Sequence, residues 1–148
     1  MFKFKNIHLD DDSMWPNEVR IELDKPFEDE RGYIQSLVNF PMKNLCMIFS
    51  KKGSVRSNHY HLTDWHYMFT VYGRFEYHYR KHDSGEELKI ETFSDGELVF
   101  TPPMEDHVCV FQEDTLIVCG SRNPRGDQAS YEADVKRIML IDPKDVNI

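Results

Sequence analysis

The sequence predicts an all-β fold, an antiparallel sandwich or barrel, and three observations support this. Short apolar or alternating segments recur along the chain, turn residues separate them, and no long helical pattern interrupts them. Segments of this length at such intervals are typical of antiparallel sheets. A length of 148 residues fits one domain with one core. We therefore predict a single domain over residues 1–148, with a barrel core at about residues 30–125.

The predicted strands, in chain order, are residues 19–23, 33–38, 45–50, 67–72, 75–80, 88–93, 98–100, 108–111 and 115–119. Residues 19–23 and 75–80 alternate apolar with polar side chains, which indicates strands with one buried face. Pro102 and Pro103 lack the backbone N–H of a central strand, so they mark an edge or a corner. Residues 131–140 fit either a short helix or a last strand across the outside of the barrel.

The composition excludes some classes of partner. The net charge is −8, from 18 Lys and Arg against 26 Asp and Glu, which disfavours nucleic acid and anionic membranes. Cys46, Cys109 and Cys119 form no C-x-x-C pattern, so we expect buried thiols and a reducing compartment. The chain starts without the apolar region of a signal peptide, and no apolar run reaches membrane-spanning length. We expect a cytoplasmic protein.

Four histidines are the strongest functional signal. His59 and His61 share one face if their segment is extended, and a barrel brings His66 and His107 to them from neighbouring strands. We predict that all four bind one divalent transition metal (Zn, Fe, Mn, Ni or Cu), since imidazole is the commonest metal ligand. The alternatives are ordinary strand histidines, or a substrate-binding His66 with Asp64 pointing inward in its place.

The spacing resembles the two motifs of the cupin superfamily. The first, G-x5-H-x-H with a later Glu and Gly, is matched by Gly53, His59, His61 and Gly73. The second, G-x5-P-x-G-x2-H-x3-N, is matched by Gly96, Pro102 and His107. His66 stands in place of the family's Glu, Met104 in place of a Gly and Phe111 in place of an Asn. The resemblance implies a double-stranded β-helix (a jelly-roll barrel) with an N-terminal strand extension and a short C-terminal segment.

The exchange of Glu for His66 changes the expected metal chemistry. Four neutral imidazoles leave the ion its full divalent charge, which makes it a stronger Lewis acid. An octahedral ion with four protein ligands keeps two open positions, whereas tetrahedral zinc would be closed and structural.

A narrower resemblance is to the nucleotide-sugar cupins, which include dTDP-4-keto-sugar 3,5-epimerases and 3,4-ketoisomerases. It rests on the stretch Asp29-Glu30-Arg31-Gly32 and on Arg56, His59 and His61. His66 occupies the place of a Gln in the ketoisomerases, where histidines act as acid and base. This resemblance implies a sugar or nucleotide sugar as substrate.

The remaining predicted site residues come from strand alternation. Placing the apolar face inward puts Phe75, Tyr77 and Tyr79 inside the barrel, where Tyr77 and Tyr79 are candidate catalytic hydroxyls. Plain core packing is the alternative for each. The predicted substrate-binding residues are Arg56, Met68, Thr70 and Phe100.

We therefore predict a metal-binding isomerase or epimerase of a small polar metabolite, with the metal polarising a carbonyl group. An iron-dependent dioxygenase and a non-catalytic sugar-binding protein are the alternatives. We expect a homodimer, because symmetric dimers are the commonest oligomers.

Overall fold

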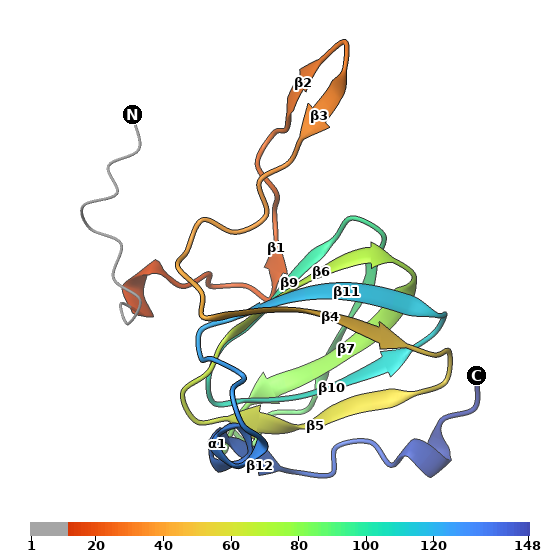
Figure 1. Ribbon diagram of the computed structural model, residues 1–148. Helices are drawn as coiled ribbons and strands as arrows, with labels where there is room; N and C mark the ends of the chain where they lie inside the picture. The colour runs from red at the N-terminus through yellow and green to blue at the C-terminus, as the bar shows by residue number, and fades with distance from the viewer. Residues whose placement is uncertain (1–11) are drawn as a thin grey trace.

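The computed structural model describes residues 12–148 and contains two five-stranded antiparallel sheets that form a jelly-roll barrel (Figure 1). In spatial order, the first sheet comprises β1 (Arg20–Ile21), β9 (Leu98–Thr101), β6 (His66–Tyr72), β11 (Thr115–Ser121) and β4 (Asn44–Ser50). The second comprises β12 (Val135–Arg137), β5 (Val55–His61), β10 (Glu105–Phe111), β7 (Arg74–Lys81) and β8 (Lys89–Ser94). The predicted all-β fold is confirmed. The sheets run from Arg20 to Arg137, which is wider than the barrel core we expected.

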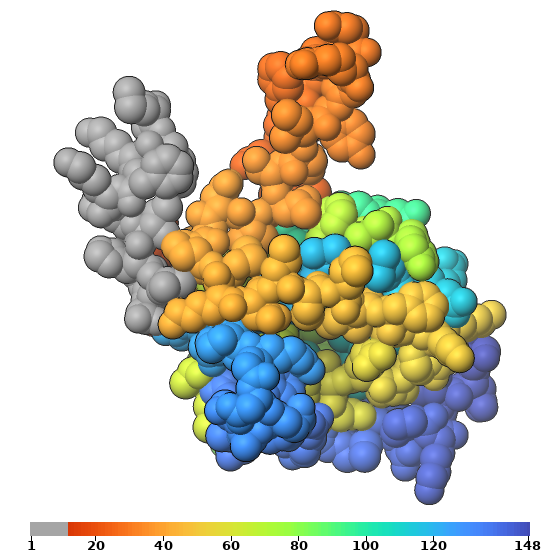
Figure 2. All heavy atoms as spheres, in the orientation of Figure 1, coloured from red at the N-terminus to blue at the C-terminus, as the bar shows by residue number. Residues whose placement is uncertain are grey.

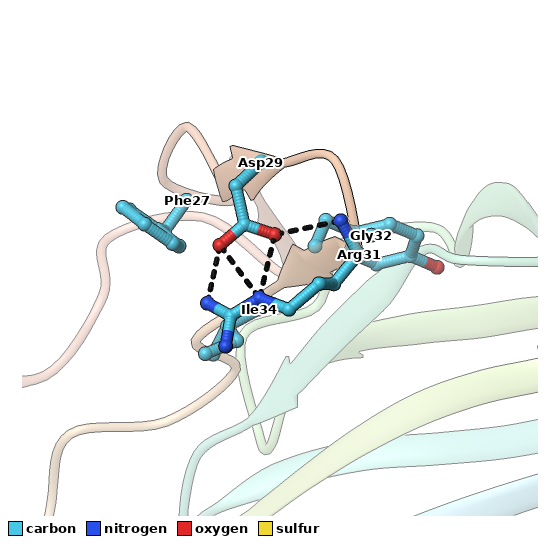
Figure 3. Close-up of a pocket in the computed structure, with 6 residues that line it drawn as sticks. Phe27, Asp29, Arg31, Gly32 and Ile34 are labelled. Carbon is cyan, nitrogen blue, oxygen red and sulfur yellow. Dashed lines mark hydrogen bonds and ion pairs between the residues drawn. The ribbon is translucent and has the colours of Figure 1, made fainter.

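A hairpin projects from the sheets (Figures 1 and 2). It pairs β2 (Phe27–Asp29) with β3 (Gly32–Ile34), so the strand predicted at residues 33–38 is shorter and lies outside the barrel. The Asp29 carboxylate closes the turn, because it accepts hydrogen bonds from the backbone N–H of Arg31 at 2.9 Å and from its guanidinium group (Figure 3). These bonds lower the pKa of Asp29.

The segment after β11 contains a helix and a strand, the two alternatives that the sequence left open for residues 131–140. Helix α1 (Gln128–Asp134) begins after Asp127, whose carboxylate accepts from the backbone N–H of Ser130 at 2.9 Å. The chain then continues as β12, which pairs with the edge of β5 and places Arg137 opposite His59. Short 3-10 helices cover Asp12–Met14 and Pro143–Asp145.

Alternation along the strands sorts the buried side chains into two clusters. The interior of the barrel contains Phe75, Tyr77, Phe93 and Phe111, with Tyr79 partly buried beside them, as predicted for the inward aromatic residues. The second cluster contains Trp65, Tyr67, Leu98 and Phe100, and the partly buried Trp15, Ile21, Leu23, Val38, Phe40, Met42 and Phe69 pack against it.

Two other expectations can be compared with the structure. Pro102 and Pro103 lie at the corner between β9 and β10, as predicted. Cys109 and Cys119 are buried free thiols, whereas Cys46 is partly exposed.

Among residues 12–148, no helix is long and apolar enough to cross a membrane. The N-terminal residues on which the signal-peptide argument rests lie outside the described part of the chain.

Candidate functional site

The four predicted histidines converge inside the barrel. β5 carries His59 and His61, β6 begins at His66, and β10 places His107 directly opposite His59. The ring centroids of His59 lie 4.7 Å from those of both His61 and His107, and the His61 and His66 centroids are 4.6 Å apart. Strand alternation and sheet pairing therefore bring together residues that are up to 48 positions apart, from His59 to His107.

A bulge in β5 positions His59. Ser57 and Asn58 both have positive φ angles, of 77° and 54°, and the register between β5 and β10 shifts at this point. The Asn58 side chain accepts from the backbone N–H groups of Leu140 and Ile141 and donates to the Ile141 carbonyl at 2.8 Å. Asn tolerates this conformation better than most residues, and bulges redirect side chains near functional sites. The C-terminal segment thus holds the strand that presents His59.

Three of the histidines fit a metal cation. The ligand atoms of His59, His61 and His107 all lie within 4.8 Å of one another. His61 is fully buried; its Nδ1 lies 3.5 Å from Oδ2 of Asp134, and its Nε2 has no hydrogen-bond partner within the described residues. His107 Nδ1 donates to the Glu105 backbone carbonyl at 2.9 Å if its proton is there, which leaves Nε2 as a lone-pair donor. A buried polar atom without a partner is costly, and a bound cation would satisfy it.

The protonation of these three rings also suits a cation. Burial lowers the pKa of His107 to about 3 and that of His61 to about 4, and it lowers the pKa of His59 as well. The neighbouring histidines act in the same direction, because adjacent imidazolium groups repel one another. The rings are therefore neutral at neutral pH, which is the form that binds metals.

His66 has a different environment from the other three. Its Nε2 lies 2.9 Å from Oδ2 of the buried Asp64, whose other oxygen accepts from the backbone N–H of Asn123 at 2.9 Å. Burial acts to raise the pKa of Asp64, but the hydrogen bond and charge of His66, the Asn123 backbone hydrogen bond and the charge of His61 together outweigh it, and the pKa is lowered. An ionised carboxylate only accepts, so Nε2 carries a proton and Nδ1 of a neutral ring carries the lone pair. Asp64 and His66 also form a second possible ligand group with His61.

A cavity of about 710 Å³ opens beside the histidines. His59, His66 and His107 lie on its wall, and α1 and β12 border it. Three arginines line it, namely Arg56, Arg125 and Arg137. Glu132 is the acidic residue of the lining, and it accepts from Arg137 at 2.8 Å. The excess of guanidinium groups gives the cavity a positive character that suits an anionic ligand.

The predicted substrate-binding residues are only partly brought together. Arg56 and Met68 line the cavity. Thr70 lies on the same face of β6 but is fully buried and does not line it. Phe100 was predicted to bind substrate but lies elsewhere. It pairs with Tyr67 and packs in the second cluster. Its neighbour Thr101 pairs with His66, so alternation along β9 directs Phe100 to the opposite face.

The two predicted catalytic tyrosines do not line the cavity. The fully buried Tyr77 hydroxyl donates to Glu105 at 2.6 Å and lies 2.7 Å from Thr101 Oγ1. Burial raises the pKa of Tyr77 far above its usual range and raises the pKa of Glu105 to about 8. Tyr79 donates to Glu91 at 3.0 Å. Both hydroxyls are engaged by glutamate side chains, although the Tyr77 ring itself stacks 5.9 Å from that of His107.

Sequence reasoning missed the cavity residues that lie after the barrel, among them Arg125, Tyr131 and Arg137. They follow the last predicted strand, and no motif marks them. Tyr131 lies with its ring centroid 6.3 Å from that of His61, and the Arg125 guanidinium group lies 4.3 Å from the Tyr131 centroid. The sequence signal for this part of the site was the pattern at residues 131–140, which fits either a helix or a strand.

Comparison with known proteins identifies the fold. No family model and no curated protein matches the chain. A TDP complex of the 3,4-ketoisomerase QdtA from Thermoanaerobacterium thermosaccharolyticum (a double mutant) has 20% identity and a TM-score of 0.65, covering 84% of this chain and 89% of that chain. The dTDP-4-dehydrorhamnose 3,5-epimerase from Sulfolobus tokodaii has 18% identity and a TM-score of 0.62, and the match covers 82% of this chain and 84% of that chain. A 3,4-ketoisomerase from Helicobacter canadensis has 16% identity and a TM-score of 0.67, covering 82% and 90%. These similarities support the predicted cupin-type fold.

Proposed function

We propose that the protein is an isomerase or epimerase that acts on a nucleotide sugar in the histidine-lined cavity. The observation that carries this proposal is the Asp64–His66 pair, because His66 lies on a cavity wall that also holds His59, His107 and three arginines. Structures of similar fold are 3,4-ketoisomerases and a 3,5-epimerase, and one of them is a complex with TDP.

Substrate binding would use the arginines. Arg56, Arg125 and Arg137 offer planar donors for the oxygens of a diphosphate group. Arg56 is already oriented, because its Nε donates to Ser50 Oγ at 2.7 Å and its terminal nitrogen donates to the Phe49 carbonyl at 3.0 Å. A volume of about 710 Å³ is in the usual range for a small-molecule site.

Proton transfer is assigned to His66. Its Nδ1 would remove a proton from the carbon next to the sugar carbonyl, and the Asp64 carboxylate would stabilise the imidazolium that forms. The resulting enediolate is reprotonated at the neighbouring carbon in an isomerisation, or on the opposite face in an epimerisation. Tyr131 lines the same cavity, and burial raises its pKa, so its protonated hydroxyl is available as a donor.

We also propose that His59, His61 and His107 hold one divalent transition metal. This set replaces the four-histidine set expected from the sequence, because these three form one compact ligand group, whereas His66 groups with His61 and Asp64. When bound, the metal supplies an electrophile that polarises the substrate carbonyl. The three-histidine group leaves His66 free to transfer protons.

Solvent isotope exchange tests the proposed reaction. Purified protein is incubated in D₂O with TDP-4-keto-6-deoxyglucose, and the sugar is analysed by proton NMR and mass spectrometry. We expect deuterium at the carbon next to the carbonyl, and slower exchange with Asp64→Asn. Binding of 4-keto nucleotide sugars without exchange or turnover would instead indicate a sugar-binding protein. Oxygen consumption by the iron-loaded protein would indicate the oxygenase.

We propose that the protein is a homodimer and that the β2–β3 hairpin contributes to the interface. Phe27, Tyr33 and Ile34 on this hairpin are 61%, 71% and 70% exposed. Together with Asp29, Arg31 and Gly32 they line a cavity of about 240 Å³ (Figure 3), which shares no residue with the histidine-lined cavity. Large apolar side chains gathered on a projecting element favour contact with another protein surface.

A further inference from the structure

Two cysteines face each other across neighbouring strands of the first sheet. In the antiparallel pairing of β4 with β11, Cys46 lies directly opposite Cys119. Opposite residues in such a pair have Cα atoms about 4.5–5.5 Å apart, and disulfides form at Cα separations of about 4.4–6.8 Å. The pairing therefore places the two residues within the Cα range that a disulfide requires.

Both cysteines lie on the wall of the substrate cavity. On its other side Cys119 pairs with Met68 of β6, which is also a cavity residue. The next inward-facing residues of β6 and β11 are His66 and Ser121, which pair with each other. The two sulfur atoms are thus one row of side chains away from His66.

The two thiols differ in access and in acidity. Cys46 is partly exposed in the cavity, whereas Cys119 is buried. The hydrogen bond from Cys119 lowers the pKa of Cys46, and the positive charge of Arg125 acts in the same direction. An accessible thiolate beside a second thiol is the arrangement of an attacking and a resolving cysteine. Cys109 is different, because it is buried in β10 and burial raises its pKa to about 12.

We propose that Cys46 and Cys119 form a thiol–disulfide exchange site in the cavity, which a small disulfide such as oxidised glutathione converts reversibly to a cross-strand disulfide. The Cys46 thiolate attacks one sulfur of the small disulfide, forms a mixed disulfide and expels one thiolate. Cys119 then loses its proton, attacks the Cys46 sulfur and expels the second thiolate. Two electrons pass from the protein to the small disulfide, which is reduced to two thiols.

Oxidation of the native protein tests this site without any substitution. The protein is equilibrated with mixtures of oxidised and reduced glutathione, the remaining thiols are alkylated, and peptides are mapped by mass spectrometry. We expect a peptide pair linked through Cys46 and Cys119, free Cys109, and full return to three thiols after excess reduced glutathione. Unmodified Cys46 and Cys119 throughout the series would overturn the proposal. A lasting glutathione adduct on Cys46, or a link that involves Cys109, would also overturn it.

Matched serine variants then separate the two roles. Cys119→Ser should trap the glutathione adduct on Cys46, and Cys46→Ser should leave Cys119 unmodified. Cys109→Ser is the control and should form the cross-strand disulfide as the native protein does. Circular dichroism checks that each variant is folded. Rapid modification of Cys119 in folded Cys46→Ser would contradict the assignment of Cys46 as the attacking thiol.

Discussion

Nε2 of His66 lies 2.9 Å from Oδ2 of Asp64, and this contact distinguishes His66 from the other three histidines of the cluster. The carboxylate is buried and is oriented by the Asn123 backbone N–H. A histidine oriented by a carboxylate can accept a proton from substrate and stabilise the resulting charge. The site therefore combines one histidine oriented by a carboxylate with three clustered histidines.

Removing the oriented histidine should remove proton transfer but leave binding. We expect His66→Gln to lower the rate of isotope exchange by about 10²–10⁴-fold, the usual contribution of a general acid or base. Asp64→Asn should lower the same rate, since the amide can no longer stabilise an imidazolium group. Calorimetric titration with TDP is the control and should give a similar affinity for both variants. A parallel loss of TDP affinity would show that the pair binds substrate instead.

Metal content should depend on three histidines. We expect His59→Ala and His107→Ala to lose a divalent transition metal that the native protein retains, because each removes one ligand of the compact group. His66→Ala should keep it. Elemental analysis of untagged protein measures the content, with Fe, Mn, Ni, Cu and Zn offered separately. Native protein that contains none of these metals and takes none up would contradict the metal proposal.

The stability of the metal-free protein should fall below about pH 6.5. His59, His61 and His107 have lowered pKa values in the folded state, so the unfolded chain, with an ordinary histidine pKa of about 6.5, binds more protons as the pH falls. Their contribution is complete above pH 6.5 and is lost as the pH falls through about 4 and 3, the folded pKa values of His61 and His107. Urea unfolding at pH 6.5 and 5 measures the difference. Equal stability at both values would contradict the lowered pKa values.

Glu105 should have the opposite effect on the pH dependence of stability, which it lowers as the pH rises. Its folded pKa is raised to about 8, so the folded state keeps a proton that the unfolded chain releases above its ordinary carboxyl pKa. Its contribution is therefore present at low pH and is lost as the pH rises toward 8. Glu105→Gln lacks this group, so the stability of the native protein relative to this variant should fall between pH 6.5 and 8. Urea unfolding of both proteins measures the difference, and the comparison cancels the opposite effect of the Cys46 thiol, whose pKa is lowered.

Gly73 should be the least replaceable of the motif glycines. A Cβ atom at Gly73, where φ is +105°, would lie 2.6 Å from the Asp114 carbonyl oxygen. At Gly53, where φ is +85°, it would meet nothing within 4 Å. We expect Gly73→Ala to cost about 3 kcal/mol or more, from overpacking added to backbone strain. Gly53→Ala should cost about 1–2 kcal/mol from strain alone. Similar midpoints in urea for the two variants would contradict the close approach at Gly73.

The projecting hairpin should control the oligomeric state. We expect light scattering after size exclusion to give a dimer for the native protein. Tyr33→Glu combined with Ile34→Glu should shift it to a monomer, because two charges would then enter an apolar contact. Glu28→Ala on the same hairpin is the control and should remain a dimer. A native monomer at all concentrations would contradict the proposal.

Much of the fold could be predicted from local patterns. Alternation predicted the inward aromatic residues of β7 correctly, and the paired prolines marked the corner after β9. The β2–β3 hairpin was missed, because its apolar residues are exposed and local alternation does not indicate which sheet a strand joins. Phe100 was misassigned, because its short strand shows no alternation that would distinguish the two buried faces.

The sequence by itself determined that His59 and His61 share a face, because side chains alternate along any strand. Together with the motif spacing, this was enough to predict that four histidines converge. Only the tertiary structure decided that Asp64 orients His66, that Tyr77 and Tyr79 lie outside the cavity, and that Cys46 faces Cys119. These relationships depend on pairing between distant strands and on how a segment after the barrel packs against it. Local periodicity carries no information about either.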